Sequence, residues 1–430
     1  MLPELFLAAQ FHFDFDLNIV GDAALHPMVE EALADQGPLP AYEDNAHVYL
    51  MGVVAAKADD SFEVGKQRFI AMNELHTNGE RKAYEGYPKT KWSKVKDEPR
   101  LCKFSGEKAE QIACFNKLNK SCAEMDALLT QYQVSVGSYR RVLGNTEIRS
   151  PSDRSMTDFQ TLEEFRALGM LAGMSHRFEF QCSLKGDHTE VIADIDQQAK
   201  ALRVLATETD DLILKVMFQI VLRDFYRWQV YNYRNNTPEL RQLPDSFFTL
   251  QTREESSLRK VLFREIANNA QMLENAYTEG LNDDEDYWKV SLFFKKNLTT
   301  NDATLSYRHA VLDSELPINR YVQDRNLPNL NSTFKWWRIT NLVGEFMNAV
   351  PTPRFLKVAV DMNNLDLIIR LSDIAINYSE LVDNNQLSSL PLSKRNPYDN
   401  SLPYFDESGK WLCFKVPEEL KTQDECIYLN

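Results

Sequence analysis

The chain contains 430 residues, of which 43% are hydrophobic and 26% are charged. This composition is typical of a folded globular protein and excludes a disordered chain or a membrane bundle. The formal net charge of −15 argues against nucleic acid as a partner, because an acidic protein repels phosphate backbones.

The beginning of the chain lacks the pattern of a secretory signal. Residues 1–16 have no basic start, no continuous apolar middle and no small-residue cleavage site. Two interpretations stay open: a cytosolic protein with reduced cysteines, or a mature form from which a leader or membrane anchor was removed. We adopt the second as the expectation because the cysteines are clustered, and we treat residues 1–40 as an N-terminal extension.

Five of the six cysteines lie in two short clusters, a pattern typical of disulfide clips and of an oxidising compartment. The clusters are Cys102, Cys114 and Cys122, then Cys413 and Cys426. We predict a disulfide between Cys102 and Cys114, which leaves Cys122 either paired with Cys182 or buried as a free thiol. Zinc binding by the first three thiolates is a rival interpretation, but their gaps exceed the usual C-x2–4-C spacing, so we assign no metal.

Helical patterns dominate the chain from residue 41 onward. Residues 41–150 are predicted to form an N-terminal helical lobe, and the polar break at 150–153 separates it from a main lobe over 151–385. Within the main lobe, capping pairs predict helix starts at Thr161, Thr207 and Thr252. Apolar periodicity predicts two further helices, one that includes 191–205 and one over 355–378. Short links favour antiparallel neighbours, so the predicted fold is all-α, an irregular stack of antiparallel helical hairpins.

The C-terminal segment 386–430 differs from the helical body. Residues 402–405 and 411–416 have strand patterns on either side of a turn-rich sequence, which predicts a small β-hairpin. We expect a disulfide between Cys413 and Cys426 to fasten the last residues onto this hairpin. By the chain-entropy relation, a loop of this size gives a stabilisation of roughly 3 kcal/mol.

Several segments of this chain are similar to segments of a known group of proteins. They are Asn45 to Gly52, the Cys102 and Cys114 pair, Asn341 to Phe346, Asn396 to Tyr398, and Trp411 to Phe414. The chain resembles a group of Gram-negative envelope proteins that have a short N-terminal membrane anchor and a helical periplasmic body. The resemblance implies a periplasmic location, with inner-membrane attachment in the full-length form through a segment that this chain lacks. It brings no activity and no catalytic residues.

The residues that most often carry chemistry form no recognisable motif. The seven histidines are scattered, without an HExxH sequence or a pair four residues apart. His176 is expected to be a core histidine, and the serine patterns at Ser175 and Ser93 are too weak to indicate a nucleophile. No phosphate-binding glycine loop occurs, so we predict no cofactor and leave catalytic residues unassigned.

An aromatic cluster with an adjacent arginine is the predicted interaction surface. Trp336, Trp337 and Arg338 are neighbours in the sequence, and aromatic residues and arginine are enriched at protein interfaces. Core packing is the competing explanation for these aromatic side chains.

We therefore expect a non-enzymatic scaffold, adaptor or chaperone of the cell envelope that presents a helical surface to a protein partner. The alternative is a hydrolase of an envelope polymer that uses a pair of carboxylates in a helical groove. An exposed apolar patch would favour the first function, and a cleft with two facing carboxylates would favour the second.

Overall fold

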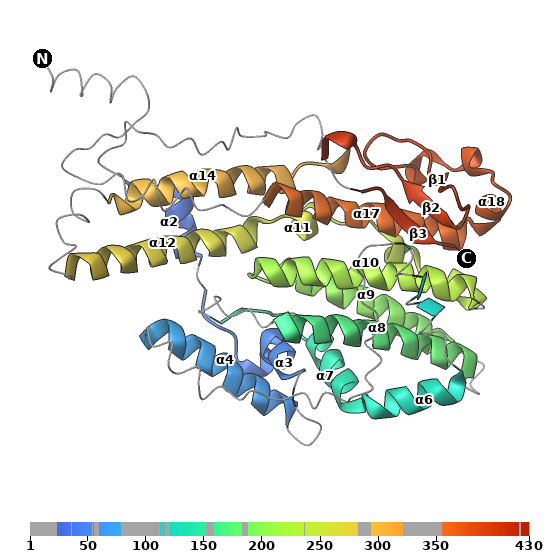
Figure 1. Cartoon of the computed structure of the whole chain (residues 1–430), viewed down its shortest axis with the longest axis horizontal. Coiled ribbons are helices and arrows are strands. Elements are labelled where there is room, and N and C mark those ends of the chain that lie inside the picture. The colour runs from blue at the N-terminus through green and yellow to red at the C-terminus, as the bar shows by residue number, and fades with distance from the viewer. Residues whose placement is uncertain are drawn as a thin grey trace, which may run out of the picture. The chain divides into compact units, whose positions relative to one another are not determined.

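The computed structural model describes residues 24–35, 37–53, 55, 60–78, 108, 112–113, 115–116, 121–151, 159–182, 188–235, 237–282, 294–320, 355–420 and 423–429. In this part of the chain the protein is mostly α-helical, with a small antiparallel sheet near the C-terminus (Figure 1). The predicted fold class is confirmed. None of the described helices is long and apolar enough to cross a membrane.

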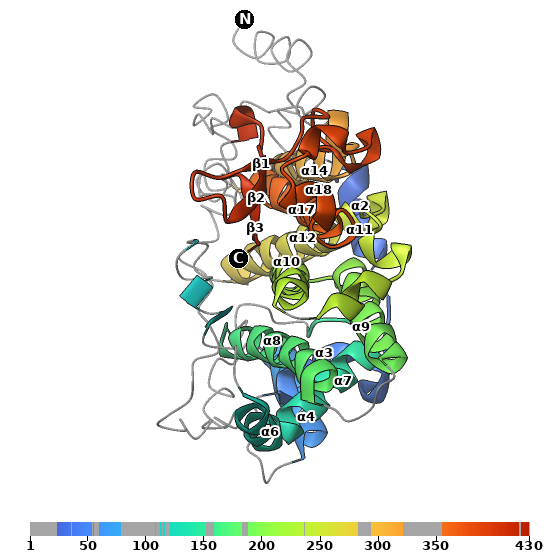
Figure 2. The same ribbon diagram turned by 90° about the vertical axis from the view of Figure 1, so that its right-hand side faces the viewer.

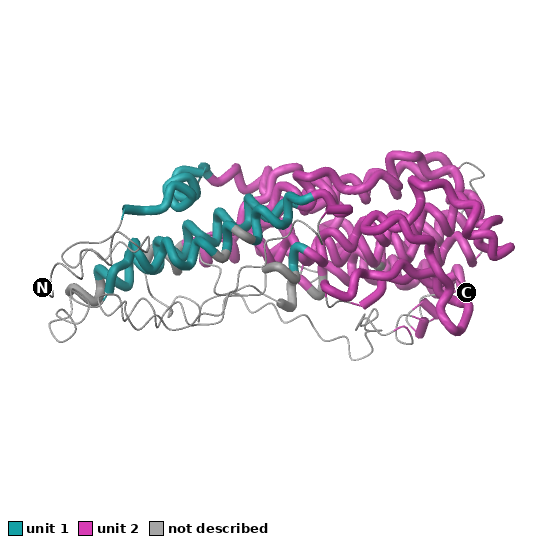
Figure 3. The backbone as a smooth tube through the Cα atoms, turned by 90° about the horizontal axis from the view of Figure 1, so that it is seen from above, with its two compact units in different colours: residues 1–38, 257–316, 324–359 teal, residues 39–256, 317–323, 360–430 magenta. Residues whose placement is uncertain are grey.

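The chain divides into two compact units, coloured in Figure 3. Unit 1 comprises 1–38, 257–316 and 324–359, and unit 2 comprises 39–256, 317–323 and 360–430. The segments of each unit are interleaved along the sequence, which linear composition does not reveal. The boundaries proposed at 40, 150 and 385 stay a prediction.

In the part of unit 1 that the structure describes, three helices lie side by side in Figures 1 and 2. They are α2 (Pro27–Ala34), α12 (Arg259–Asn282) and α14 (Lys296–Ser314). Helices α12 and α14 form an antiparallel hairpin. Ser314 at the end of α14 accepts a hydrogen bond from the Leu258 amide just before α12, whereas Lys296 at the start of α14 pairs with Glu274 near the end of α12. Such hairpins are the predicted building block of the fold.

Unit 2 contains the other helices that the structure describes, together with the sheet. Its helices are α3 (Ala46–Gly52), α4 (Ser61–Asn78), α6 (Cys122–Gln131), α7 (Gln133–Gly144), α8 (Phe159–Cys182), α9 (Thr189–Glu208), α10 (Leu212–Arg234), α11 (Arg253–Ser256), α18 (Ser379–Asp383) and, from Val360 onward, α17 (Phe355–Asn377). Helices α8, α9 and α10 pack against one another and place large aromatic side chains of α10 in the core.

The capping predictions have mixed outcomes. Thr252 and Glu255 form the predicted reciprocal hydrogen bonds, but the helix they start is the short α11, and the longer α12 begins afresh at Arg259. The prediction that Thr207 caps the next helix is wrong, because Thr207 lies inside α9. The cap of α10 is Asp211, whose carboxylate accepts hydrogen bonds from the amides of residues 213 and 214. Thr161 also lies inside its helix, α8.

Asn45 joins the start of α3 to a distant segment of unit 2. Its side-chain oxygen accepts the amides of His47 and Arg149, and its side-chain nitrogen donates to the Arg149 carbonyl. The Ala46 amide donates to the Glu147 carbonyl alongside. Asn45 is fully buried, so these bonds satisfy polar groups that water cannot reach.

Two glycines allow α3 and α4 to approach closely. A Cβ atom on Gly52 would overlap the Ser61 carbonyl oxygen, and one on Gly65 would overlap the Val48 carbonyl oxygen. Neither obstacle is a flexible side chain, so the backbones would have to separate to admit a methyl group.

Substituting Gly65→Ala is therefore expected to lower the free energy of unfolding by about 2 kcal/mol or more, because the α3–α4 contact must open. Gly137→Ala in α7 is the matched control, since nothing lies near its added methyl group and alanine favours a helix. Denaturant unfolding of the two variants checks this. Equal stability of both would contradict the close-packing account.

The sheet contains three antiparallel strands in the order β1, β2, β3, namely Tyr404–Phe405, Trp411–Phe414 and Glu425–Tyr428. The first two strands form the predicted hairpin. The third strand was not predicted, and it pairs with β2 so that Cys413 lies opposite Cys426. All residues of β2 and β3 are buried, which makes the sheet part of the core of unit 2.

Candidate functional site

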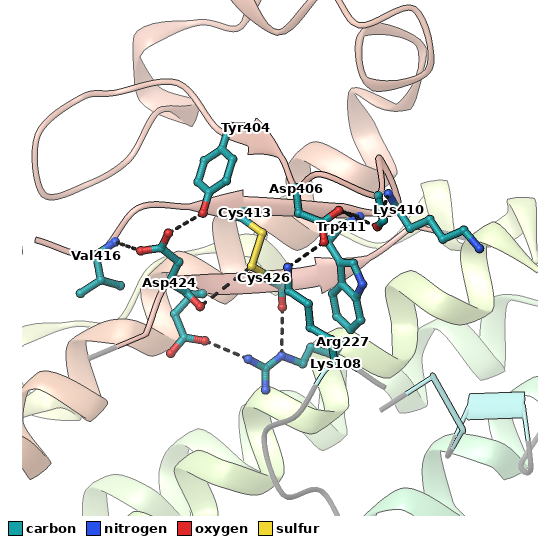
Figure 4. Close-up of a disulfide and its surroundings, with 12 residues drawn as sticks. Lys108, Arg227, Tyr404, Asp406, Lys410, Trp411, Cys413, Val416, Asp424 and Cys426 are labelled. Atoms are coloured by element: carbon teal, nitrogen blue, oxygen red, sulfur yellow. Dashed lines mark hydrogen bonds and ion pairs between the residues drawn. A yellow bond between two sulfur atoms is a disulfide. The ribbon is translucent and has the colours of Figure 1, made fainter. Parts of the chain in front are cut away.

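The predicted disulfide between Cys413 and Cys426 is present and joins β2 to β3 (Figure 4). Around it, the Tyr404 hydroxyl donates to the Asp424 carboxylate, and Asp424 also accepts the Val416 amide. These contacts fasten the last strand to the hairpin from both sides. The disulfide and these two hydrogen bonds serve as a structural clamp.

Glu425 connects the sheet to α10. Its carboxylate pairs with Arg223 and with Arg227, the latter at 2.8 Å, and Arg227 also donates to the Cys426 carbonyl. Burial lowers the pKa of Arg227, while the nearby Glu425 opposes that shift. The described sheet is thus held to the helical body by charge pairs taken out of water.

A second disulfide joins Cys122 at the start of α6 to Cys182 at the end of α8. Of the two alternatives left open for Cys122, pairing with Cys182 is the one observed. The predicted partners Cys102 and Cys114 lie outside the described residues, as does the predicted interaction surface formed by Trp336, Trp337 and Arg338.

The buried His176 forms a pair with Asp194, whose side chain is half exposed. The ring nitrogen Nε2 lies 2.7 Å from the Asp194 carboxylate, and this hydrogen bond holds the pKa of Asp194 below its usual value. The neighbouring Ser175 hydroxyl donates to the Ala172 carbonyl within the helix. His176 is therefore a core histidine, as predicted, and the pair joins α8 to α9. Groups of three or more metal-ligating side chains are not found among the described residues.

Asp366 of α17 is a buried carboxylate without a salt bridge among its described contacts. It accepts the backbone amide of Gln251 at 2.9 Å, and the Gln251 side chain also donates to the Met362 carbonyl. Burial raises the pKa of Asp366 to about 6, because desolvation outweighs these hydrogen bonds. The group thus changes charge in a mildly acidic range.

Replacing Asp366 by Asn should make the free energy of unfolding depend less on pH between about 4 and 6. The folded-state pKa lies above the ordinary value of 3.8, so the stability that Asp366 contributes is complete below about pH 4 and is lost as the pH rises through about 6. That loss amounts to about 3 kcal/mol, and it should be missing in Asp366→Asn. Denaturant unfolding at pH 4 and pH 7 measures it, with Asp126→Asn on the exposed face of α6 as control. Identical pH dependence of wild type and Asp366→Asn would refute the assignment.

An open pocket of about 430 Å³ lies in unit 2 where α17 meets α18. It is lined by Arg241, Asn377, Tyr378, Ser379, Glu380 and Leu381. Arg241 donates to the Tyr233 hydroxyl and to the Ser379 hydroxyl, and these two hydroxyls lie 3.0 Å apart. Glu380 is the one carboxylate among the lining residues, so this pocket does not provide the facing pair that a carboxylate hydrolase needs.

Two exposed leucines lie on one side of α14 in unit 1. Leu305 and Leu312 lie seven residues apart, and their exposed fractions are 44% and 47%. The opposite side of the helix is buried, including Ala310 and Val311. Residues seven apart occupy the same side of a helix, so the two leucines lie on one side of α14, with the exposed Arg308 between them.

Sequence reasoning missed both features. Arg241 and Ser379 lie 138 residues apart, so no local spacing marks the pocket. The leucines of α14 were visible in the sequence, but their exposure depends on which side of the helix faces α12.

Comparisons with protein-family models, curated protein sequences and solved structures find no match to this chain. The resemblance to envelope proteins therefore stays an expectation from the sequence.

Proposed function

We propose that the protein is a non-enzymatic scaffold, adaptor or chaperone of the cell envelope that presents a helical surface to a protein partner. The exposed face of α14 carries this proposal. Exposed large apolar side chains that line up on one side of a folded helix are a feature of surfaces that bind other proteins.

The proposed partner contributes an amphipathic helix. The seven-residue spacing of Leu305 and Leu312 matches the repeat by which two helices pack along a shared seam, and Leu298 stands one repeat earlier in a half-buried position. Arg308 is exposed between the two leucines and offers a charged contact beside the seam. An acidic position on the partner helix would complement it.

The paired cysteines support the proposed location. The bonds Cys122–Cys182 and Cys413–Cys426 each join separate elements of unit 2. Bonds of this kind persist in oxidising compartments such as the periplasm and are rare in the cytosol. An envelope protein without a cofactor can use them as its source of added stability.

The proposal predicts that Leu305→Glu with Leu312→Glu abolishes partner binding while leaving the fold intact, since both side chains are already exposed. A photo-crosslinking amino acid in place of Arg308 detects contact between α14 and a partner protein in the native host. Leu392→Glu is the matched control, because Leu392 is 62% exposed on a different element. We expect one heteromeric crosslink that persists in the control and disappears in the double variant, with unchanged thermal unfolding.

Two outcomes would contradict the proposal. A crosslink to a second copy of this chain would make the face a self-association surface. A heteromeric crosslink that survives both leucine substitutions would show that the partner does not rest on α14.

A further inference from the structure

The pocket where α17 meets α18 contains two opposite charges that are not paired with each other. Arg241 and Glu380 both line it, and within the described residues no ion pair joins them. The neighbouring charges are already used: Arg234 pairs with Asp383 at 2.6 Å, and Lys394 pairs with Asp373 at 2.5 Å. Arg241 and Glu380 are thus the charges left for a ligand at this place.

The guanidinium of Arg241 is held in position before any ligand arrives. Its Nε atom donates to the Tyr233 hydroxyl and one terminal nitrogen donates to the Ser379 hydroxyl. It also lies 5.7 Å from the centre of the Tyr233 ring, within the range of a cation–π contact. The other terminal nitrogen has no described partner, so the fixed arginine retains N–H donors for an anion.

Glu380 supplies the opposite charge. Its side chain is exposed at the start of α18, and the described residues give its carboxylate no hydrogen bond or ion pair. An ionised carboxylate accepts hydrogen bonds and carries a negative charge, so it suits a cationic donor such as an ammonium. Asn377 also lines the pocket, and its amide nitrogen donates to Asp373.

We propose that this pocket binds a small zwitterion, in which a carboxylate contacts Arg241 and an ammonium contacts Glu380. Free amino acids and short peptides share this chemistry. The volume of about 430 Å³ falls within the range of small-molecule sites. Tyr378 and Leu381 add apolar surface on the lining, which suits an aliphatic side chain.

Calorimetric titration of the full chain with L-leucine and with L-leucyl-L-leucine tests the proposal. Binding of the amino acid alone, of the peptide alone or of both identifies the source of the zwitterion. N-acetyl-L-leucine lacks the ammonium and L-leucine amide lacks the carboxylate, so each should bind about tenfold more weakly or worse.

Two variants assign the contacts. Arg241→Gln and Glu380→Gln should each weaken binding of the zwitterion about tenfold, because each removes one charge-assisted contact. Arg141→Gln and Glu407→Gln remove exposed charges elsewhere in unit 2 and should leave affinity unchanged. Thermal unfolding of all four verifies the fold.

The proposal is overturned if neither probe binds at millimolar concentration, or if the acetylated or amidated compound binds as well as the zwitterion. It is also overturned if the control variants lose as much affinity as the pocket variants. Partner binding by α14 is measured separately, so failure here does not decide the adaptor function.

Discussion

The pairing of buried charge between α10 and the C-terminal sheet is the constraint on which unit 2 depends. Glu425 enters the core on β3 and meets two arginines one helical turn apart, Arg223 and Arg227. Each of these groups would be costly to bury alone, and a pair that loses one member leaves an uncompensated charge. The charge pairs therefore fix where the strand lies on the helix, and the disulfide of the neighbouring Cys426 then closes the sheet.

Buried asparagines play the same role in two other places. Asn45 joins α3 to residues 147–149, and Asn396 accepts the Tyr398 amide while donating to the Lys415 carbonyl. The Tyr398 hydroxyl then donates to Asn364 of α17. Both asparagines are fully buried. The segments Asn45 to Gly52 and Asn396 to Tyr398 thus have a structural role, since each contains a polar side chain that satisfies backbone groups between elements.

The sequence predicted the elements whose signals are local. The hairpin strands, the Thr252 capping box and the helix that contains 191–205 depend on residues near one another, and each is present. The predicted cap at Thr207 is wrong because Asp211, whose backbone is extended, caps the start of α10 instead. Strand β3 was not predicted because it is short and contains a glutamate. The burial of that glutamate depends on the arginines of α10, which are far away in the sequence. Arg241, Tyr233 and Ser379 come together through the fold alone, so their pocket had no signal in the sequence.

The two proposed surfaces lie in different units and use different chemistry. The α14 face offers exposed leucines to a helix, whereas the pocket beside α18 offers a fixed guanidinium and a free carboxylate to a zwitterion. Both require rigid elements beneath them, and in unit 2 that rigidity comes from buried pairs and disulfides that join distant segments.

Amide hydrogen exchange in the Glu425→Gln variant tests the central claim most directly. If buried charge pairing holds the sheet on α10, protection of residues 411–414 and 425–428 should fall markedly, while Glu407→Gln leaves it at the wild-type level. Unchanged protection in Glu425→Gln would show that the disulfide and apolar packing suffice, and that the charge pairs do not organise this unit.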